Sequence, residues 1–436
     1  MKALLTGILL LLLCSNLCGY PLNATEETGI LRLEGYRLFQ SGAVKGRQLV
    51  PGALLPLQQV QLRLTDRPDA QLPPIDPQLT SEIVAMLDEE QNYSFSLLDL
   101  SNPDQPLLAE HQADRDFNPG SLGKLLIAVG LFQALADRYP EDIEARRTLL
   151  RERWLTADQF ILNDGHRVPF WDAARQRMTY RKIVTGDRAN LYSWLDWMLS
   201  PSSNAAAAMV LREYLLMVKF KADYPVNQAT AESFFSNTSK GELMQLLIDS
   251  LHEPMRRNGL DPGQLRQGGF FTWKGKELVP GGSSRANTRS LLTLLLRLEQ
   301  GRLVDPFSSL ELKRLLYMTE KRIRYASHPA LDQAAVYFKS GSLYSCAPEA
   351  GFVCDKYQGN KQNLLNSLAI IEQQQGESLL HYLIVVSSNV LRVNSAVAHQ
   401  TLAMRIHRLL ERRAKERLKI RSEAAESGRQ VGRSGD

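Results

Sequence analysis

Residues 118–131 read NPGSLGKLLIAVGL, and the rest of the chain is organised around this stretch. Asn118 and Pro119 are typical of a helix start. The almost wholly apolar run that follows predicts a helix buried on most sides. The first turn nevertheless carries Ser121 and Lys124, whose side chains share one helix face because they are three residues apart.

A hydroxyl and an amine at this position form a candidate catalytic pair. Burial and the partial positive charge of a helix N-terminus both disfavour a protonated lysine. Lys124 would then accept a proton and activate Ser121 without a histidine. Ser121 begins the only Ser-x-x-Lys sequence in the chain. A capped core helix with a surface lysine fits the same pattern, since short motifs often occur by chance.

Length and composition indicate a globular protein. The chain has 436 residues, 44% of them hydrophobic, enough for a sizeable core and for more than one subdomain. Its formal net charge is +5, and the basic segment 405–436 accounts for this excess. Nucleic-acid binding is therefore not expected. The basic helix 405–421 is a candidate for peripheral contact with an anionic membrane surface, with a solvated helix end as the alternative.

The N-terminus predicts export. Residues 1–24 combine a basic start, a short apolar core and a polar exit, which is typical of a cleaved signal peptide. We therefore expect a periplasmic or secreted protein. A lipidated Cys14 or Cys18 is less favoured, because leucine precedes each cysteine where a small residue is required. An uncleaved anchor is a further alternative that is less favoured. The remaining Cys346 and Cys354 predict a local disulfide, with two free thiols as the alternative.

The order of predicted elements indicates the fold class. Two strands, at 93–100 and 107–111, precede a largely helical region at about 118–330, and three more, at 334–343, 368–372 and 379–386, follow it. We expect an α/β (α+β) fold, with an antiparallel five-stranded sheet covered by helices, plus an all-helical subdomain. A cleft between the two parts would be a natural site.

Further segments flank this domain, which we place at 79–412. Residues 25–78 are expected to form an N-terminal extension and linker, with a strand at 60–65 and a proline-rich end. A long helix is expected from 395 to about 419. Residues 413–436 are expected to form a basic, partly disordered tail.

Two further motifs connect the candidate pair to a known chemistry. Ser202-Ser203-Asn204 is expected in a loop between helices, and Lys339-Ser340-Gly341 on the first strand after the helical region. The order Ser-x-x-Lys, Ser-x-Asn, Lys-[Ser/Thr]-Gly is that of class A β-lactamases and penicillin-binding proteins. Over about 79–412 the chain resembles these penicillin-recognising serine hydrolases, which implies the β-lactamase/transpeptidase-like fold.

The resemblance implies catalytic roles. Ser121 would be the acylated nucleophile and Lys124 its proton acceptor. Ser202 would pass the proton to the leaving nitrogen, and Asn204 would hold the substrate amide and Lys124. A loop-capping serine and a polar interhelical asparagine are the structural alternatives at positions 202 and 204.

It also implies how the substrate is bound. Lys339 and Ser340 would bind the substrate carboxylate, and Gly341 would let the strand approach closely. The backbone N–H groups of Ser121 and Ser342 would stabilise the oxyanion. A lysine on a solvated edge strand is the alternative for position 339.

One family feature is missing. Class A β-lactamases release the acyl group with a glutamate and an asparagine of the omega loop, whereas residues 271–281 contain no Glu-x-x-Leu-Asn pattern. Glu277 would be the deacylation base after a shift of register. Otherwise the acyl-enzyme would be long-lived.

The sequence thus predicts an active-site serine hydrolase that acts on a carboxylate-bearing amide, in the manner of β-lactam hydrolysis. The alternatives are a D,D-peptidase or cell-wall amidase or esterase, and a non-catalytic sensor that binds β-lactams or peptidoglycan. The expected partner is a small β-lactam or a peptidoglycan-derived molecule. No cofactor or metal is expected, since the histidines show no metal-ligand spacing.

Overall fold

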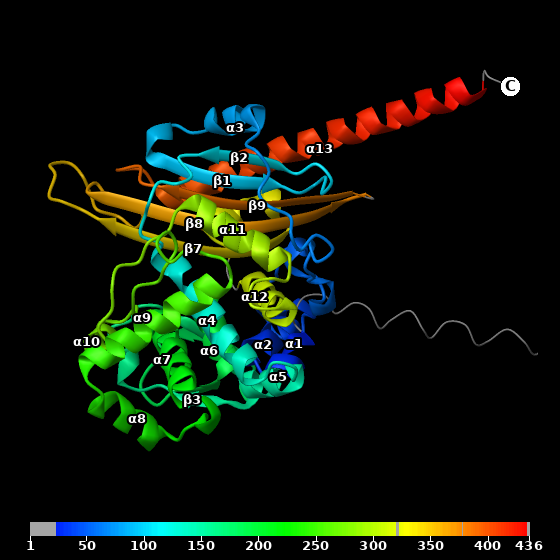
Figure 1. Cartoon of the computed structure of the whole chain (residues 1–436). Helices are drawn as coiled ribbons and strands as arrows, with labels where there is room; N and C mark the ends of the chain where they lie inside the picture. Colours follow the sequence, from blue (N-terminus) through cyan, green and yellow to red (C-terminus); the bar gives the residue numbers. More distant parts are fainter. Residues whose placement is uncertain (1–22, 320–321, 377, 434–436) are drawn as a thin grey trace, which may run out of the picture.

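The computed structural model describes residues 23–319, 322–376 and 378–433 (Figure 1). The predicted signal peptide, with Cys14 and Cys18, lies outside the described residues except for its last two positions.

A five-stranded antiparallel sheet confirms the predicted fold class. The strands lie in the order β2-β1-β9-β8-β7. Their bounds are β1 Tyr93–Asp99, β2 Leu107–His111, β7 Ala335–Ser345, β8 Gln362–Gln375 and β9 Ser378–Ser388. Strand β1 pairs with β9, so segments almost 300 residues apart meet in the middle of the sheet. Strand β7 is left as the edge that faces the helical region.

Helices cover both faces of the sheet (Figure 1). On β9, Leu383 and Val385 pack into one hydrophobic cluster, and Ile384 and Val386 into the other. This alternation explains the continuous apolar run of β9, because a strand covered on both sides has no solvent face. The covering helices are α3 Pro77–Val84 and α13 Ser395–Arg433 on one face, and α11 Thr288–Glu299 and α12 Pro306–Tyr317 on the other.

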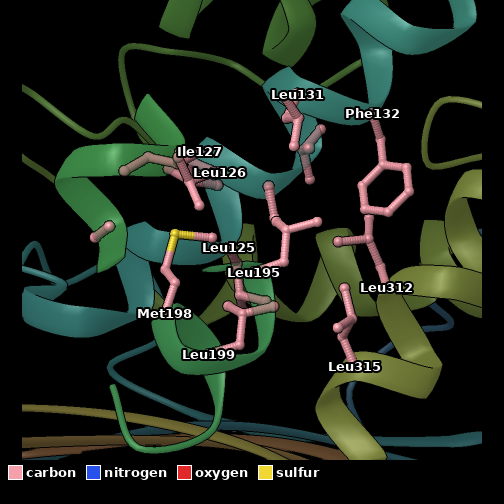
Figure 2. Packing of buried hydrophobic residues seen from close by; sticks show 14 of the residues in the cluster. Leu125, Leu126, Ile127, Leu131, Phe132, Leu195, Met198, Leu199, Leu312 and Leu315 are labelled. Carbon is pink, nitrogen blue, oxygen red and sulfur yellow. The ribbon is translucent and has the colours of Figure 1, made fainter. Parts of the chain in front are cut away.

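Helix α4, Gly123–Arg138, forms the centre of the helical region. Figure 2 shows its apolar side chains packed against Leu195, Met198 and Leu199 of α6 and against Leu312 and Leu315 of α12. Within the described residues, only the stretch Gly120–Arg138 is long and apolar enough to cross a membrane, and most of it is buried. The remaining helices of this region are α5 Ile143–Glu152, α6 Leu191–Leu199, α7 Asn204–Phe220, α8 Gln228–Asn237, α9 Lys240–Arg257 and α10 Trp273–Leu278.

The helical region also contains two small sheets that we did not expect. Strands β3 Trp154–Thr156 and β6 Arg188–Asn190 form one, and β4 Val168–Asp172 and β5 Arg177–Arg181 the other. Strands of three to five residues show too little alternation to be recognised in a sequence.

Residues 25–78 pack against the domain rather than standing apart as an extension. Helices α1 Ala24–Thr28 and α2 Leu31–Gln40 contribute buried side chains, including Leu33 and Tyr36, to the core around α4. The strand predicted at 60–65 is wrong, because the chain there is irregular after a short 3₁₀ turn at Leu57–Gln59. Arg63 instead reaches the sheet and pairs with Glu372, at 2.8 Å.

The tail at 413–436 was expected to be partly disordered, whereas helix α13 continues through most of it, to Arg433. Its C-terminal part projects beyond the body of the protein (Figure 1). Extending a helix that already exists is much easier than nucleating a new one, so α13 continues although Gly428 and Gly432 lie in this segment. Contact of this helix with a membrane stays a prediction.

A buried ion pair fixes the N-terminal segment to the helical region. The Arg32 guanidinium of α2 binds both oxygens of Asp196 on α6, at 2.6 and 2.5 Å, and both side chains are buried. We expect Asp196→Ala to lower the free energy of unfolding by about 3–5 kcal/mol, because Arg32 keeps a buried charge without its carboxylate. Urea unfolding followed by circular dichroism measures this.

The control is Arg37→Ala on the same helix, which removes a more exposed pair with Glu34. This variant should lower the free energy of unfolding by less than about 1 kcal/mol. Equal effects of the two variants would contradict an anchoring role for the buried pair.

Candidate functional site

A cavity of about 1300 Å³ lies where the edge strand β7 meets the helical region. It brings together residues from all three motifs, although they are up to 220 positions apart in the chain. The predicted residues in its lining are Ser121, Ser202, Asn204, Lys339, Ser340, Gly341 and Ser342. Lys124 lies just behind this lining and is fully buried.

The turn before α4 presents the candidate nucleophile. Residues Gly120–Leu122 form a 3₁₀ turn, and the Asn118 side chain accepts a hydrogen bond from the Gly120 N–H, at 2.9 Å. Asn118 therefore shapes the turn rather than capping α4 in the expected way. Gly120 has φ +53°, a conformation that glycine adopts without strain.

Lys124 contacts polar groups of both the first and the second motif. Its Nζ lies 3.1 Å from Ser121 Oγ, and it donates to the Ser202 carbonyl at 2.6 Å and to Asn204 Oδ1 at 2.7 Å. Burial lowers the pKa of Lys124 to about 7, while the Asp164 carboxylate opposes the shift. A substantial fraction of the lysine is therefore neutral near pH 7 and able to take the proton of Ser121. The surface-lysine alternative is excluded.

Ser202 links two lysines. Its Oγ accepts a hydrogen bond from Lys339 Nζ at 2.7 Å and lies 3.4 Å from Lys124 Nζ. Lys339 is buried, and burial, together with the charges of Lys124 and Arg324, holds its pKa well below the usual lysine value. A hydroxyl between two amines is suited to relay a proton.

Strand β7 touches the nucleophile turn at a position that only glycine fits. A Cβ at Gly341 would lie 2.5 Å from the Pro119 carbonyl oxygen and 2.6 Å from the Ser121 nitrogen. A Cβ at Gly120 would lie 3.6 Å from the Ser342 nitrogen. The amides of Ser121 and Ser342 are thus close together, as two donors to one oxyanion must be.

Sequence analysis missed Arg324, which belongs to no motif. It opens a 3₁₀ turn, Arg324–Ser327, with φ +54°. Its guanidinium donates to Ser340 Oγ at 2.7 Å, to Ser342 Oγ at 3.1 Å and to the Tyr357 hydroxyl at 2.8 Å. It therefore adds a fixed positive charge beside the residues expected to bind a carboxylate.

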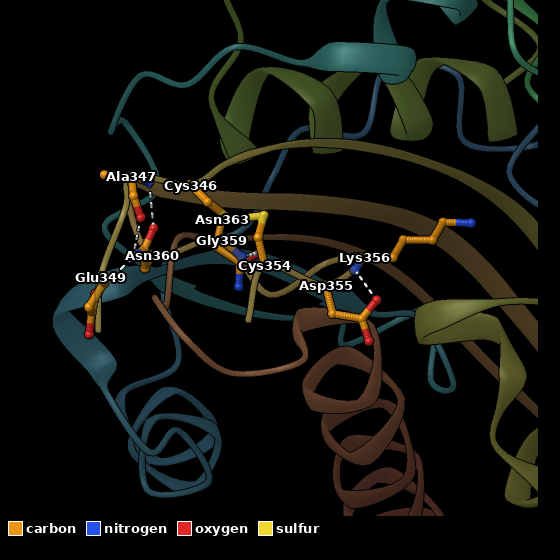
Figure 3. The surroundings of a disulfide bond; sticks show 9 residues. All are labelled: Cys346, Ala347, Glu349, Cys354, Asp355, Lys356, Gly359, Asn360 and Asn363. Carbon is orange, nitrogen blue, oxygen red and sulfur yellow. Dashed lines mark hydrogen bonds between the residues drawn. A yellow bond between two sulfur atoms is a disulfide. The ribbon is translucent and has the colours of Figure 1, made fainter. Parts of the chain in front are cut away.

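Tyr357 is held in place by the loop between β7 and β8. The predicted disulfide between Cys346 and Cys354 closes this loop, as Figure 3 shows, and Tyr357 follows three residues later. Burial raises the pKa of the Tyr357 hydroxyl, but Arg324 outweighs this effect and leaves the pKa below the usual tyrosine value.

Asp164 positions the second motif. Its carboxylate accepts hydrogen bonds from Ser203 Oγ and from the Ala205 N–H, both at 2.9 Å, and pairs with His166 Nδ1 at 2.6 Å. Although burial acts the other way, the contacts with His166 and Ala205 keep the pKa of Asp164 below its usual value. Asp164 was missed in the sequence, because nothing in the pattern of residues 163–165 reveals partners about 40 residues away.

Glu277 does not join the site. Its side chain is 39% exposed and pairs with Lys274 at 2.9 Å. It is not part of the cavity lining, and no Asp or Glu occurs among the described residues that line the cavity. The assignment of Glu277 as deacylation base is therefore wrong, because the short helix α10 turns it towards Lys274.

One buried group of side chains has the composition of a metal site. Ligand atoms of Glu299, Glu372 and His381 lie within 4.8 Å of one another in the core. Lys313 Nζ, however, lies 2.6 Å from Glu299 and 2.5 Å from Glu372. The ammonium thus supplies the positive charge that the two carboxylates require, and the cluster ties α11 and α12 to the sheet.

The model of the beta-lactamase enzyme family matches residues 78–361. The chain belongs to the β-lactamase enzyme family. No curated protein matches it.

Several solved structures resemble this β-lactamase-family protein. PBP-A has a TM-score of 0.46 and 15% identity, over 78% of this chain and 100% of its own. A β-lactamase from Chitinophaga pinensis DSM 2588 has a TM-score of 0.45 and 17% identity, over 76% and 96%. The TLA-3 extended-spectrum β-lactamase has a TM-score of 0.49 and 12% identity, over 77% and 98%.

The buried Lys124 makes stability depend on pH. In the unfolded chain its pKa is about 10.4, whereas in the folded protein it is about 7. Between these values the unfolded state binds more protons, so the free energy of unfolding rises with pH, by up to about 1.4 kcal/mol per pH unit for one lysine. We expect the free energy of unfolding of Lys124→Met to rise less steeply with pH than that of the wild type, by about 1 kcal/mol per pH unit between pH 7 and 9. Urea unfolding at a series of pH values measures this.

Lys274→Met, a change on the surface helix α10, should keep the wild-type slope. A slope in Lys124→Met equal to that of the wild type would show that the pKa of this lysine is not lowered.

Proposed function

We propose that this protein is an active-site serine hydrolase that forms an acyl-Ser121 intermediate with β-lactams and with amides that carry a nearby carboxylate. The observation that carries the proposal is the continuous line of polar contacts from Ser121 through Lys124 and Ser202 to Lys339. The polar atoms of neighbouring groups in this line lie no more than 3.4 Å apart. This is the connection that proton transfer from a nucleophile to a leaving group requires.

The chemistry follows from these contacts. Neutral Lys124 takes the proton of Ser121 while Oγ attacks the amide carbonyl carbon. The amides of Ser121 and Ser342 stabilise the negative charge that develops on the carbonyl oxygen. The C–N bond then breaks, and Ser202 gives its proton to the leaving nitrogen and is reprotonated from Lys124. The product of this half-reaction is an ester of Ser121.

The carboxylate of the substrate would bind where Arg324, Ser340 and Lys339 meet. Arg324 supplies positive charge and Ser340 supplies a hydroxyl. The Lys339 amine, whose pKa is lowered in the free site, would be favoured in its charged form by the bound carboxylate. Charge-assisted hydrogen bonds to a carboxylate contribute about 1.5–3 kcal/mol each. This arrangement would orient the scissile bond towards Ser121.

Release of the acyl group distinguishes two functions of the same site. Efficient β-lactam hydrolysis needs a base that activates water against the ester, and no carboxylate lines the cavity among the described residues. We therefore favour slow hydrolysis of β-lactams and a physiological reaction on a peptidoglycan-derived peptide, in the manner of a D,D-peptidase. A β-lactamase with rapid turnover is the second candidate.

We also propose that the protein acts outside the cytoplasm. The N-terminal sequence has the composition of a signal peptide, and a disulfide such as Cys346–Cys354 is expected mainly in an oxidising compartment.

The test is to incubate the protein with a fluorescent penicillin and, separately, with a chromogenic cephalosporin. We expect one covalent adduct per chain by mass spectrometry, mapped to the peptide that contains Ser121, with turnover of less than about one per minute. Ser121→Ala should abolish the adduct, because it removes the attacking oxygen. An adduct that persists in Ser121→Ala, or none in the wild type, would contradict the proposed nucleophile.

Ser283→Ala is the matched control, since Ser283 also lines the cavity but makes no contact with the Ser121–Lys124 pair in the described structure. It should label like the wild type. Rapid turnover of the cephalosporin would favour the β-lactamase over the peptidase.

A further inference from the structure

The cavity around Ser121 is lined by charges of one sign. Among the described residues of its lining there is no carboxylate. The cationic side chains are Arg167, Lys276, Arg322, Arg324, Lys339 and Lys356. A cleft lined by one sign of charge concentrates ligands of the opposite sign, because its walls focus the field.

Arg324 and Lys339 already have a role on the sheet side. Arg324 is fixed by Ser340, Ser342 and Tyr357, and Lys339 by Ser202. Two cations and two hydroxyls are sufficient for one carboxylate. The proposed carboxylate site therefore leaves the other cations of the cavity unexplained.

Lys276 and Arg167 come from the helical side of the cavity. Lys276 belongs to α10, and Arg167 lies just before β4. Thr272, at the start of α10, donates a hydrogen bond to the Phe160 carbonyl, at 2.7 Å, so α10 packs against the turn that lies seven residues before Arg167. The residue before Thr272 is Phe271, whose ring lies 4.6 Å from Lys124 Nζ. The segment that carries Lys276 thus begins next to the catalytic lysine.

Neither of these two charges is neutralised in the described part of the chain. On α10, Lys274 pairs with Glu277, whereas Lys276 has no hydrogen-bond or ion-pair partner among the described residues. Arg167 is held by hydrogen bonds from Nε and Nη2 to the Tyr180 carbonyl, which is uncharged. Both side chains are exposed, so they attract an anion through their charge rather than through a preformed binding geometry.

We propose that Lys276 and Arg167 form a second anion subsite, so that the preferred substrate carries two anionic groups. One is the carboxylate beside the scissile amide, held by Arg324 and Lys339. The other belongs to the acyl group that is transferred to Ser121, as in a short peptide with an acidic side chain. This inference rests on the proposed function and specifies its substrate class. The cavity volume, about 1300 Å³, leaves room for such an acyl group beyond the reacting bond.

Three penicillins that differ only at the α-carbon of the side chain test the subsite. Benzylpenicillin has a hydrogen there, carboxybenzylpenicillin a carboxylate and aminobenzylpenicillin an ammonium group. We expect the second-order acylation rate at low salt to be about five- to tenfold higher for the carboxylate than for benzylpenicillin, and lower for the ammonium compound. Added salt should reduce these differences.

The double variant Lys276→Met/Arg167→Gln should bring the carboxybenzyl-to-benzyl ratio close to one. The measured quantity is the ratio of the two acylation rates, so a general loss of activity in the variant would leave it unchanged. Lys274→Met on the same helix is the matched control and should keep the wild-type ratio.

Two results would overturn the subsite: equal acylation by all three penicillins in the wild type, or a carboxylate preference that survives in the double variant. Absence of acylation by any of the three is a separate result, because it overturns the proposed function on which the subsite rests.

Discussion

The burial of Lys124 is the constraint on which the rest of the structure depends. An amine in an apolar core is costly as a cation, so it loses its proton near neutral pH or must be hydrogen-bonded on all sides. Helix α4 provides the apolar surroundings, and Ser121, Ser202 and Asn204 provide the polar partners. The same burial that destabilises the fold makes the amine a base, which is the usual conflict between stability and activity at a catalytic site.

The remaining elements hold other groups against this lysine. Strand β7 brings Gly341 against the nucleophile turn, and Asp164 fixes the start of α7, from which Ser202 and Asn204 reach Lys124. The sheet is assembled from both ends of the chain, so the helical region is joined to it at both of its ends, through β2 and through β7. The distance between β7 and α4 is therefore set by the packed core rather than by a flexible linker.

Much of this arrangement could be predicted from the sequence, because motifs and apolar periodicity are local patterns. The five strands followed from the apolar patterns along the chain. The meeting of Ser121 and Lys339 in one cavity followed from the family resemblance that the order of the motifs indicates. Arg324 could not be predicted, since its role depends on a turn that places it beside β7. Arg32 was missed because its partner Asp196 lies 164 residues away in the sequence. Glu277 was misassigned because the sequence does not show which side chains of α10 point into the cavity.

The central claim is that Lys124 is the base that activates Ser121, and the pH dependence of acylation tests it most directly. The second-order rate of acylation by benzylpenicillin, measured from pH 5.5 to 9 by stopped-flow fluorescence, should rise with a single apparent pKa near 7, because only the neutral amine accepts the proton. A rate that is constant over this range, or that rises only above pH 9 as for an ordinary lysine, would contradict the account.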